Sequence, residues 1–93
     1  MLYLYLVTYD LNKPVQEYDE LYKELKNSGT WWHYLDSTWL ISTSESINNL
    51  RQRIQAKIDT NDNLLIFDIT SKAYDGWLPK EAWDWIRSHI AGL

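Results

Sequence analysis

Two aspartates stand at the ends of apolar runs, and both are potential metal ligands. Asp10 closes the first run of the chain, and Asp62 precedes a later one. Hard divalent cations prefer carboxylate oxygens, and bound Mg²⁺ or Mn²⁺ can stabilise charge on a phosphate and activate water. A single carboxylate is insufficient, so Asp10 would need Asp62 or a second copy of the chain. The alternative is that Asp10 only accepts backbone hydrogen bonds in the turn after its strand.

His33 is the second residue with catalytic chemistry, because an imidazole can act as a general acid or base near neutral pH. Ser37 and Thr38 follow it at an expected turn and could donate hydrogen bonds to a ligand phosphate or carbonyl. The alternative is a structural histidine on an edge strand, with the two hydroxyl residues serving the turn. A serine–histidine nucleophilic pair is not expected, because Ser37 lies four residues away along the hairpin.

Three tryptophans, Trp31, Trp32 and Trp39, flank this histidine in the sequence. Indole rings can stack on the bases of a single-stranded nucleic acid, which would make these residues a binding surface. Large aromatic side chains also serve packing, either inside a sheet or at a subunit interface. Both interpretations remain open from the sequence.

The composition is that of a folded chain of 93 residues, with 45% hydrophobic residues and a formal net charge of −4. This length predicts one domain, residues 1–93. The absence of cysteine excludes disulfides and thiolate zinc sites and fits a cytoplasmic protein. The negative charge argues against strong non-specific binding of DNA or RNA, although it allows a local basic patch or a metal-bridged phosphate. Residues 1–7 lack a basic start, so we expect no signal peptide and no association with a membrane.

The hydrophobic periodicity predicts four strands and three helices. An i, i+3, i+4, i+7 pattern indicates the first helix, Ser44 is the expected N-cap of the second, and Pro79 fits the first turn of the last. The predicted elements are a strand at 2–9, a helix at 17–27, strands at 31–35 and 38–43, a helix from Ser44 to about Ile58, a strand at 64–69 and a helix at 79–90. This order predicts an α+β, ferredoxin-like βαββαβ antiparallel sheet with two helices on one face and a C-terminal helix.

The topology also predicts which residues meet. We expect strands 2–9 and 38–43 to lie side by side and parallel at the centre of the sheet, with their carboxyl ends together. Asp10 should then cluster with Thr43 and Ser44, and residues 31–33 and Asp62 should lie close by.

The expected turn at Asp36–Ser37 predicts the register of the hairpin. It places Trp32 opposite Ile41, so that Trp32 and Trp39 share one face of the sheet while Trp31 and His33 share the other. A slip of one residue would exchange these faces.

Both faces of the predicted sheet are apolar, and two helices cover only one. We therefore expect a homodimer that buries the second face. The competing solution is that the C-terminal segment folds back over this face in the same chain.

Several short motifs resemble known families: Tyr9-Asp10-Leu11, Trp31-Trp32-His33, Ser37-Thr38-Trp39-Leu40 and Asp62-Asn63-Leu64-Leu65. Together they resemble the small bacterial and phage proteins labelled "SinR family". The strand end Val7-Thr8-Tyr9-Asp10-Leu11 also resembles the CRISPR-associated endoribonucleases of the adaptation complex and the virulence-associated protein D toxins. The resemblance implies a ferredoxin-like homodimer in which Asp10 approaches its symmetry mate and holds a divalent metal for phosphodiester cleavage.

These observations lead to two functional hypotheses. The first is a small dimeric, non-catalytic binding module that uses its Trp/His surface for a nucleic acid, a nucleotide or a protein partner. The alternative is a metal-dependent endonuclease, similar to toxins or CRISPR adaptation proteins, that uses Asp10 across a dimer axis. The net charge of −4 favours the first hypothesis.

Overall fold

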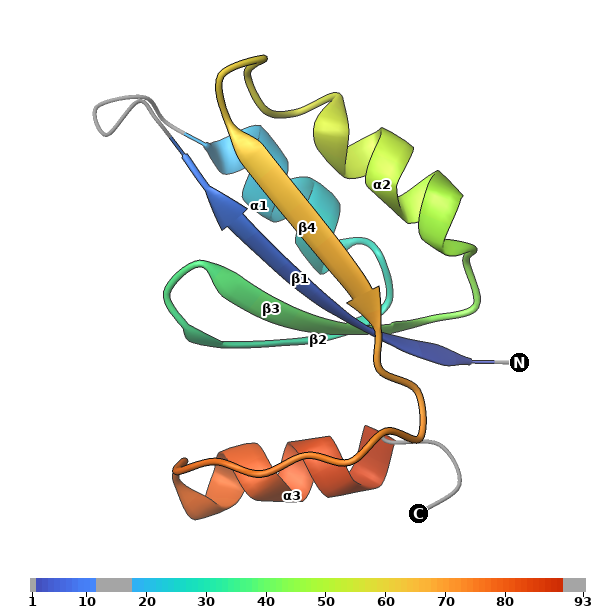
Figure 1. Cartoon of the computed structure of the whole chain (residues 1–93), viewed down its shortest axis with the longest axis vertical. Coiled ribbons are helices and arrows are strands. Elements are labelled where there is room, and N and C mark those ends of the chain that lie inside the picture. The colour runs from blue at the N-terminus through green and yellow to red at the C-terminus, as the bar shows by residue number, and fades with distance from the viewer. Residues whose placement is uncertain (1, 12–17, 90–93) are drawn as a thin grey trace.

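The computed structural model describes residues 2–11 and 18–89, which form a four-stranded antiparallel sheet and three helices (Figure 1). The elements are β1 (Tyr3–Asp10), α1 (Asp19–Lys26), β2 (Thr30–Leu35), β3 (Thr38–Thr43), α2 (Ile47–Gln55), β4 (Asn63–Asp68) and α3 (Lys80–His89). The strands lie in the order β2-β3-β1-β4. The α+β class is thus confirmed, and the arrangement is consistent with a ferredoxin-like fold. Residues 17 and 90, at the ends of two predicted helices, lie outside the described residues.

Helix α2 begins two residues later than the sequence suggested. Its N-cap is Ser46, whose side chain accepts a hydrogen bond from the backbone N–H of Asn49 at 3.2 Å. The prediction of Ser44 was wrong because the chain leaving β3 makes its own local turn there. In that turn the backbone N–H of Glu45 donates to Thr43 Oγ1 at 3.2 Å.

The prediction that the first and third strands are parallel was wrong, because β1 and β3 pair antiparallel. A crossover through α1 makes β1 and β2 run in the same direction, and β3 reverses at the hairpin before it enters between them. Thr43 therefore lies opposite Tyr3, while Thr38 lies opposite Thr8. The carboxyl end of β1 meets the hairpin turn, and the predicted cluster of Asp10 with Thr43 and Ser44 does not form.

The hairpin turn lies where the sequence placed it, with Leu35 paired to Thr38. Farther along, Trp32 pairs with Leu40 instead of Ile41, because a β-bulge or irregularity intervenes between Trp32 and Leu35. The extra residue shifts the register by one, so the predicted faces are exchanged. Trp32 now shares a face with Leu40, and Trp31 lies against Trp39 on the opposite face.

The first face of the sheet is covered by α1 and α2 (Figure 1). Helix α1 contributes Leu21 and Leu25, and α2 contributes Leu50 and Ile54; all four are fully buried. They pack on side chains that alternate along the two central strands: Tyr5, Val7, Tyr9, Trp39 and Ile41.

The second face is covered by α3, which lies on the other side of the sheet (Figure 1). Ala82 and Ile86 of this helix are buried against Leu4, Trp32 and Leu40. The C-terminal segment therefore covers this face within the chain, as in the competing solution to the dimer. None of the helices among the described residues could cross a membrane.

The cover over the second face is incomplete. Leu65 and Phe67 of the edge strand β4 remain 51% and 56% exposed. A homodimer is therefore still a prediction, with the uncovered half of this face as the available surface.

Candidate functional site

Asp10 is the last residue of β1 and is exposed at the open end of the sheet. On one side its strand neighbour is Asn63, the first residue of β4. On the other side lies the β2–β3 hairpin turn, since the backbone N–H of Tyr9 donates to the Ser37 carbonyl at 3.2 Å. A depression of about 270 Å³ opens between the end of β1, the hairpin turn and α1, and its lining is Tyr9, Asp10, Leu11, Tyr22, Asp36 and Ser37.

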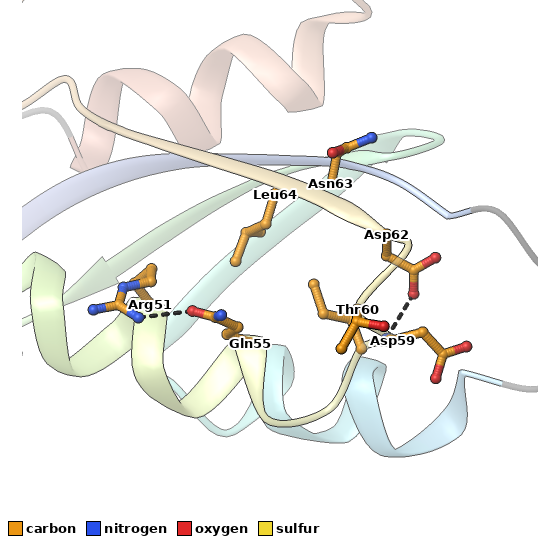
Figure 2. A pocket seen from close by; sticks show the side chains of 8 residues that line it. Arg51, Gln55, Asp59, Thr60, Asp62, Asn63 and Leu64 are labelled. Carbon is orange, nitrogen blue, oxygen red and sulfur yellow. Dashed lines mark hydrogen bonds between the residues drawn. The ribbon is translucent and has the colours of Figure 1, made fainter.

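Strand alternation assigns Asp10 to the second face, the face that α3 covers in part. Leu4 packs with α3, so Asp10, at an even spacing from it, lies on the same side of β1. Asn63 and Leu65 occupy the matching side of β4. In agreement, Figure 2 shows the Asn63 side chain directed away from Leu64, which faces the helices. A carboxylate, an amide and the exposed apolar strip of β4 thus share one surface.

A single chain does not supply a full metal site from residues 2–11 and 18–89. No group of three or more His, Cys, Asp or Glu side chains there is arranged so that it could hold a metal ion. Asp10 and Asn63 offer oxygen atoms of the type that Mg²⁺ and Mn²⁺ prefer, but further ligands have to come from elsewhere.

Asp62, the other predicted metal ligand, has a role inside its own loop. Its carboxylate accepts hydrogen bonds from the backbone N–H of Asp59 at 2.8 Å and from the Tyr18 hydroxyl at 3.3 Å. It lines a separate pocket beside α2, together with Arg51 and Gln55, and Figure 2 shows this arrangement. These contacts hold the turn that leads into Asn63.

His33 is exposed on the edge strand β2, with one face of its ring on Trp39. The centroids of the two rings are 3.8 Å apart and their planes differ by 11°. His33 Nε2 lies 2.6 Å from the carbonyl oxygen of Asp36. Because a carbonyl oxygen only accepts, Nε2 carries the proton of this hydrogen bond. The ring is thereby fixed to the hairpin turn that forms one wall of the Asp10 depression.

The three predicted binding tryptophans occupy very different environments. Trp39 is completely buried and Trp32 nearly so, which leaves neither ring a face for a ligand in this structure. Trp31 is 38% exposed, and the Lys26 Nζ atom lies 5.3 Å from its ring centroid. Within this group, Trp31 alone presents its ring to solvent.

Ser37 and Thr38 connect the hairpin turn to β1. The Ser37 carbonyl is the acceptor for Tyr9, and the hydroxyl oxygens of Thr38 and Thr8 are 3.2 Å apart. Ser37 also lines the depression beside Asp10. Both residues therefore position the turn, and Ser37 could also contact a ligand bound in the depression.

A family comparison covers most of the chain. The family model described as CRISPR associated protein Cas2 matches residues 1–76. The chain belongs to the Cas2 family. The match contains β1 to β4 and ends before α3, so the helix that covers the second face lies outside the part shared with the Cas2 model.

Membership in the Cas2 family confirms the resemblance to the CRISPR-associated endoribonucleases of the adaptation complex. It gives no support to the first functional hypothesis, that of a non-catalytic binding module. The "SinR family" label stays a prediction.

Sequence reasoning missed three residues near Asp10 in this Cas2-family chain. Tyr9 and Tyr22 line the depression, and Asn63 stands beside the carboxylate. Burial raises the pKa of Tyr9 to about 12, so its hydroxyl stays protonated at neutral pH and accepts a hydrogen bond from Trp39 Nε1 at 2.9 Å. Asn63 stands in one of the motifs quoted from the sequence, but its place beside Asp10 follows from the antiparallel register of β1 and β4.

Proposed function

We propose that this Cas2-family protein is a metal-dependent endonuclease that acts as a ferredoxin-like homodimer, with Asp10 of both copies at the cleavage site. The observation that carries the proposal is the position of Asp10. It lies at the exposed end of β1, on the face where Leu65 and Phe67 are uncovered.

The exposed strip of β4 supplies the reason for dimerisation. Burial of apolar area contributes roughly 25 cal/mol per Å², and two adjacent exposed side chains on an edge strand favour contact with a second copy. A symmetric contact on this half of the face uses the same residues from both copies. Because Asp10 shares the face, such a contact would bring the carboxylates toward each other.

The residues proposed to hold Mg²⁺ or Mn²⁺ are Asp10 and its neighbour Asn63, each from both copies. A divalent ion bound there would stabilise charge on a phosphate and activate water. Asp62 is proposed to position Asn63 through the loop contacts already described. His33 is the proposed proton-exchanging group, with its ring fixed by the hairpin turn.

The direct test measures cleavage of labelled single-stranded RNA and duplex DNA in Mg²⁺, in Mn²⁺ and in EDTA. We expect metal-dependent cleavage that falls by about 100-fold or more in Asp10→Asn, because a catalytic metal lowers the reaction barrier by several kcal/mol. The matched control is Asp75→Asn. Asp75 is also an exposed aspartate but is not a proposed metal ligand, and asparagine keeps the Oδ1 atom that accepts a hydrogen bond from the Gly76 backbone N–H.

Cleavage by Asp10→Asn at the wild-type rate would overturn the proposal. If the wild type binds nucleic acid but shows no turnover in either metal, the non-catalytic binding module becomes the better description. The exposed Trp31 ring beside Lys26 is the specific observation in favour of that second function.

A further inference from the structure

The β2 edge carries an aromatic and basic surface of which the proposed cleavage site uses only His33. Trp31 and His33 lie on the same side of this strand, and both rings contact the buried Trp39 beneath them. Two residues along a strand correspond to about 6.6 Å, so the rings form a short row. We call the surface formed by Lys26, Trp31 and His33 the β2-edge platform.

We propose that the β2-edge platform binds unpaired bases of a single-stranded nucleic acid and leads the strand toward Asp10. The inference rests on the proposed function for the identity of the reacting site. It adds a substrate-binding surface on the β2 edge.

The rings of the platform are rigid and open to solvent on one side. His33 is exposed although one ring face is stacked on Trp39, so its other face is directed outward. Its hydrogen bond to the Asp36 carbonyl prevents the ring from turning. A planar ring held in place loses little conformational entropy when a base stacks on it.

The charges beside the platform complement a phosphate backbone. Lys23 and Lys26 are exposed in the last turn of α1, and Lys26 already lies over the Trp31 ring. Arg53, by contrast, is paired with Glu24 and Glu45 and is not available in the same way. Two exposed lysines therefore lie beside this edge, although the whole chain is acidic.

The platform is continuous with the Asp10 depression. Tyr22 lies 6.5 Å from His33, centroid to centroid, and also lines the depression. Asp36, which accepts the His33 hydrogen bond, forms another part of its wall. A strand stacked on Trp31 and His33, on the first face, would thus be led to this depression and would reach the Asp10 carboxylate, on the second face, around the open end of the sheet.

The shape of the edge argues against the other common occupant, an added β-strand from a protein. The irregularity between Trp32 and Leu35 interrupts the regular ladder of this edge. Bulges at edge strands hinder pairing with a further strand, whereas base stacking does not need a regular backbone.

The test is the affinity for a fluorescein-labelled single-stranded oligouridylate, measured by anisotropy in the Asp10→Asn background without divalent metal. We expect Trp31→Ala to weaken binding roughly tenfold, because base–aromatic stacking contributes on that scale. Trp31→Phe should restore most of the affinity. Lys26→Met should weaken binding and reduce its salt dependence by about one phosphate contact.

The matched control is Tyr34→Ala, which removes an exposed aromatic ring from the opposite face of the same strand and should leave the affinity unchanged. No binding by the parent protein, equal affinity for a duplex, or wild-type affinity in both Trp31→Ala and Lys26→Met would overturn the inference. If Trp31→Ala does not fold, Lys26→Met and His33→Ala decide the outcome.

The two proposals fail in different ways. Unchanged affinity in the platform variants together with metal-dependent cleavage that needs Asp10 rejects the platform alone. Weakened affinity without any cleavage by the wild type rejects the endonuclease and retains the platform.

Discussion

The two faces of the sheet are buried to very different degrees. On the first face, two helices cover the central strands, and Val7, Trp39 and Ile41 are completely buried. On the second face, a single helix covers one half and leaves Leu65 and Phe67 more than half exposed. The first face therefore carries most of the stability, whereas the second is available for contacts with other molecules.

The polar residues follow the same division. The first face is bounded by an ionic cluster in which Arg53 binds Glu24, Glu45 and the Ser28 hydroxyl, tying α1, α2 and their connections together. The Arg53 guanidinium lowers the pKa of Glu45 through its hydrogen bonds. The second face instead ends in Asp10 and Asn63, which are exposed at the open end of the sheet. A well-buried face thus supports a surface left free for chemistry.

The largest expected effect is that of Trp39→Ala on the first face. Loss of a fully buried indole should lower the free energy of unfolding by about 3–5 kcal/mol, because it creates a cavity under Tyr9, Tyr22 and His33. Urea unfolding followed by far-UV circular dichroism measures the change. Trp83→Ala, on the partly buried side of α3, is the matched control and should cost clearly less. Equal losses for the two variants would contradict the comparison.

A smaller and more local effect is expected for Ile86→Ala in α3. Removal of this buried side chain should cost about 2 kcal/mol and loosen α3 from the sheet. Hydrogen exchange should show faster exchange of the α3 amides, with β1 and β3 protected as before. Leu50→Ala, under the first face, should instead accelerate exchange throughout the described sheet. Uniform acceleration by Ile86→Ala would show that the two faces unfold together.

Tyr9 gives the comparison a pH dependence. Its pKa is raised from 10.0 to about 12 by burial, so the folded state holds the phenol proton more tightly than the unfolded state. This contribution is complete below pH 10 and is lost as the pH rises through 12. Tyr9→Phe should cost about 1 kcal/mol at neutral pH, since Trp39 Nε1 loses its acceptor, and should flatten the alkaline loss of stability. An unchanged alkaline slope, measured by urea titrations at several pH values, would contradict this account.

The smallest effect on monomer stability is expected for Phe67→Ser on the uncovered half of the second face. Exposed substitutions usually change the free energy of unfolding by less than about 0.5 kcal/mol. The variant should nevertheless weaken the proposed dimer, whereas Phe67→Leu should retain it. Light scattering should give the wild type a mass near twice the 11.1 kDa of one chain. A wild-type mass near one chain would contradict the dimer and the pairing of Asp10 across it.

The sequence was a good guide to the elements and a poor guide to their contacts. Periodicity located the helices and strands because it reports local burial, and the Asp36–Ser37 turn was confirmed. The direction of β3 beside β1 is a property of the whole topology, and the error there moved Thr43 to the wrong end of the sheet.

The candidate site shows the same limit. Asp10, His33 and Ser37 were identified by residue type, and the structure places all three around the open end of β1 or the hairpin turn. Their neighbours Tyr22 and Asn63 were not identified, because tertiary packing and strand register determine which residues lie beside the three. The choice between Ser44 and Ser46 as N-cap was equally beyond local sequence, since both are suitable residue types.

The irregularity in β2 has a consequence for insertions and deletions in this region. The pairs Trp32–Leu40 and Leu35–Thr38 differ by one residue in register, so β2 contains one residue more than its partner requires. Deletion of Tyr34 would bring both pairs into one continuous register and leave every tryptophan on its present face. β3 has no such extra residue. Deletion of one residue from its middle would shift the register and exchange the faces on which part of its side chains lie. Length variation among related chains should therefore be tolerated at residue 34 and selected against within β3.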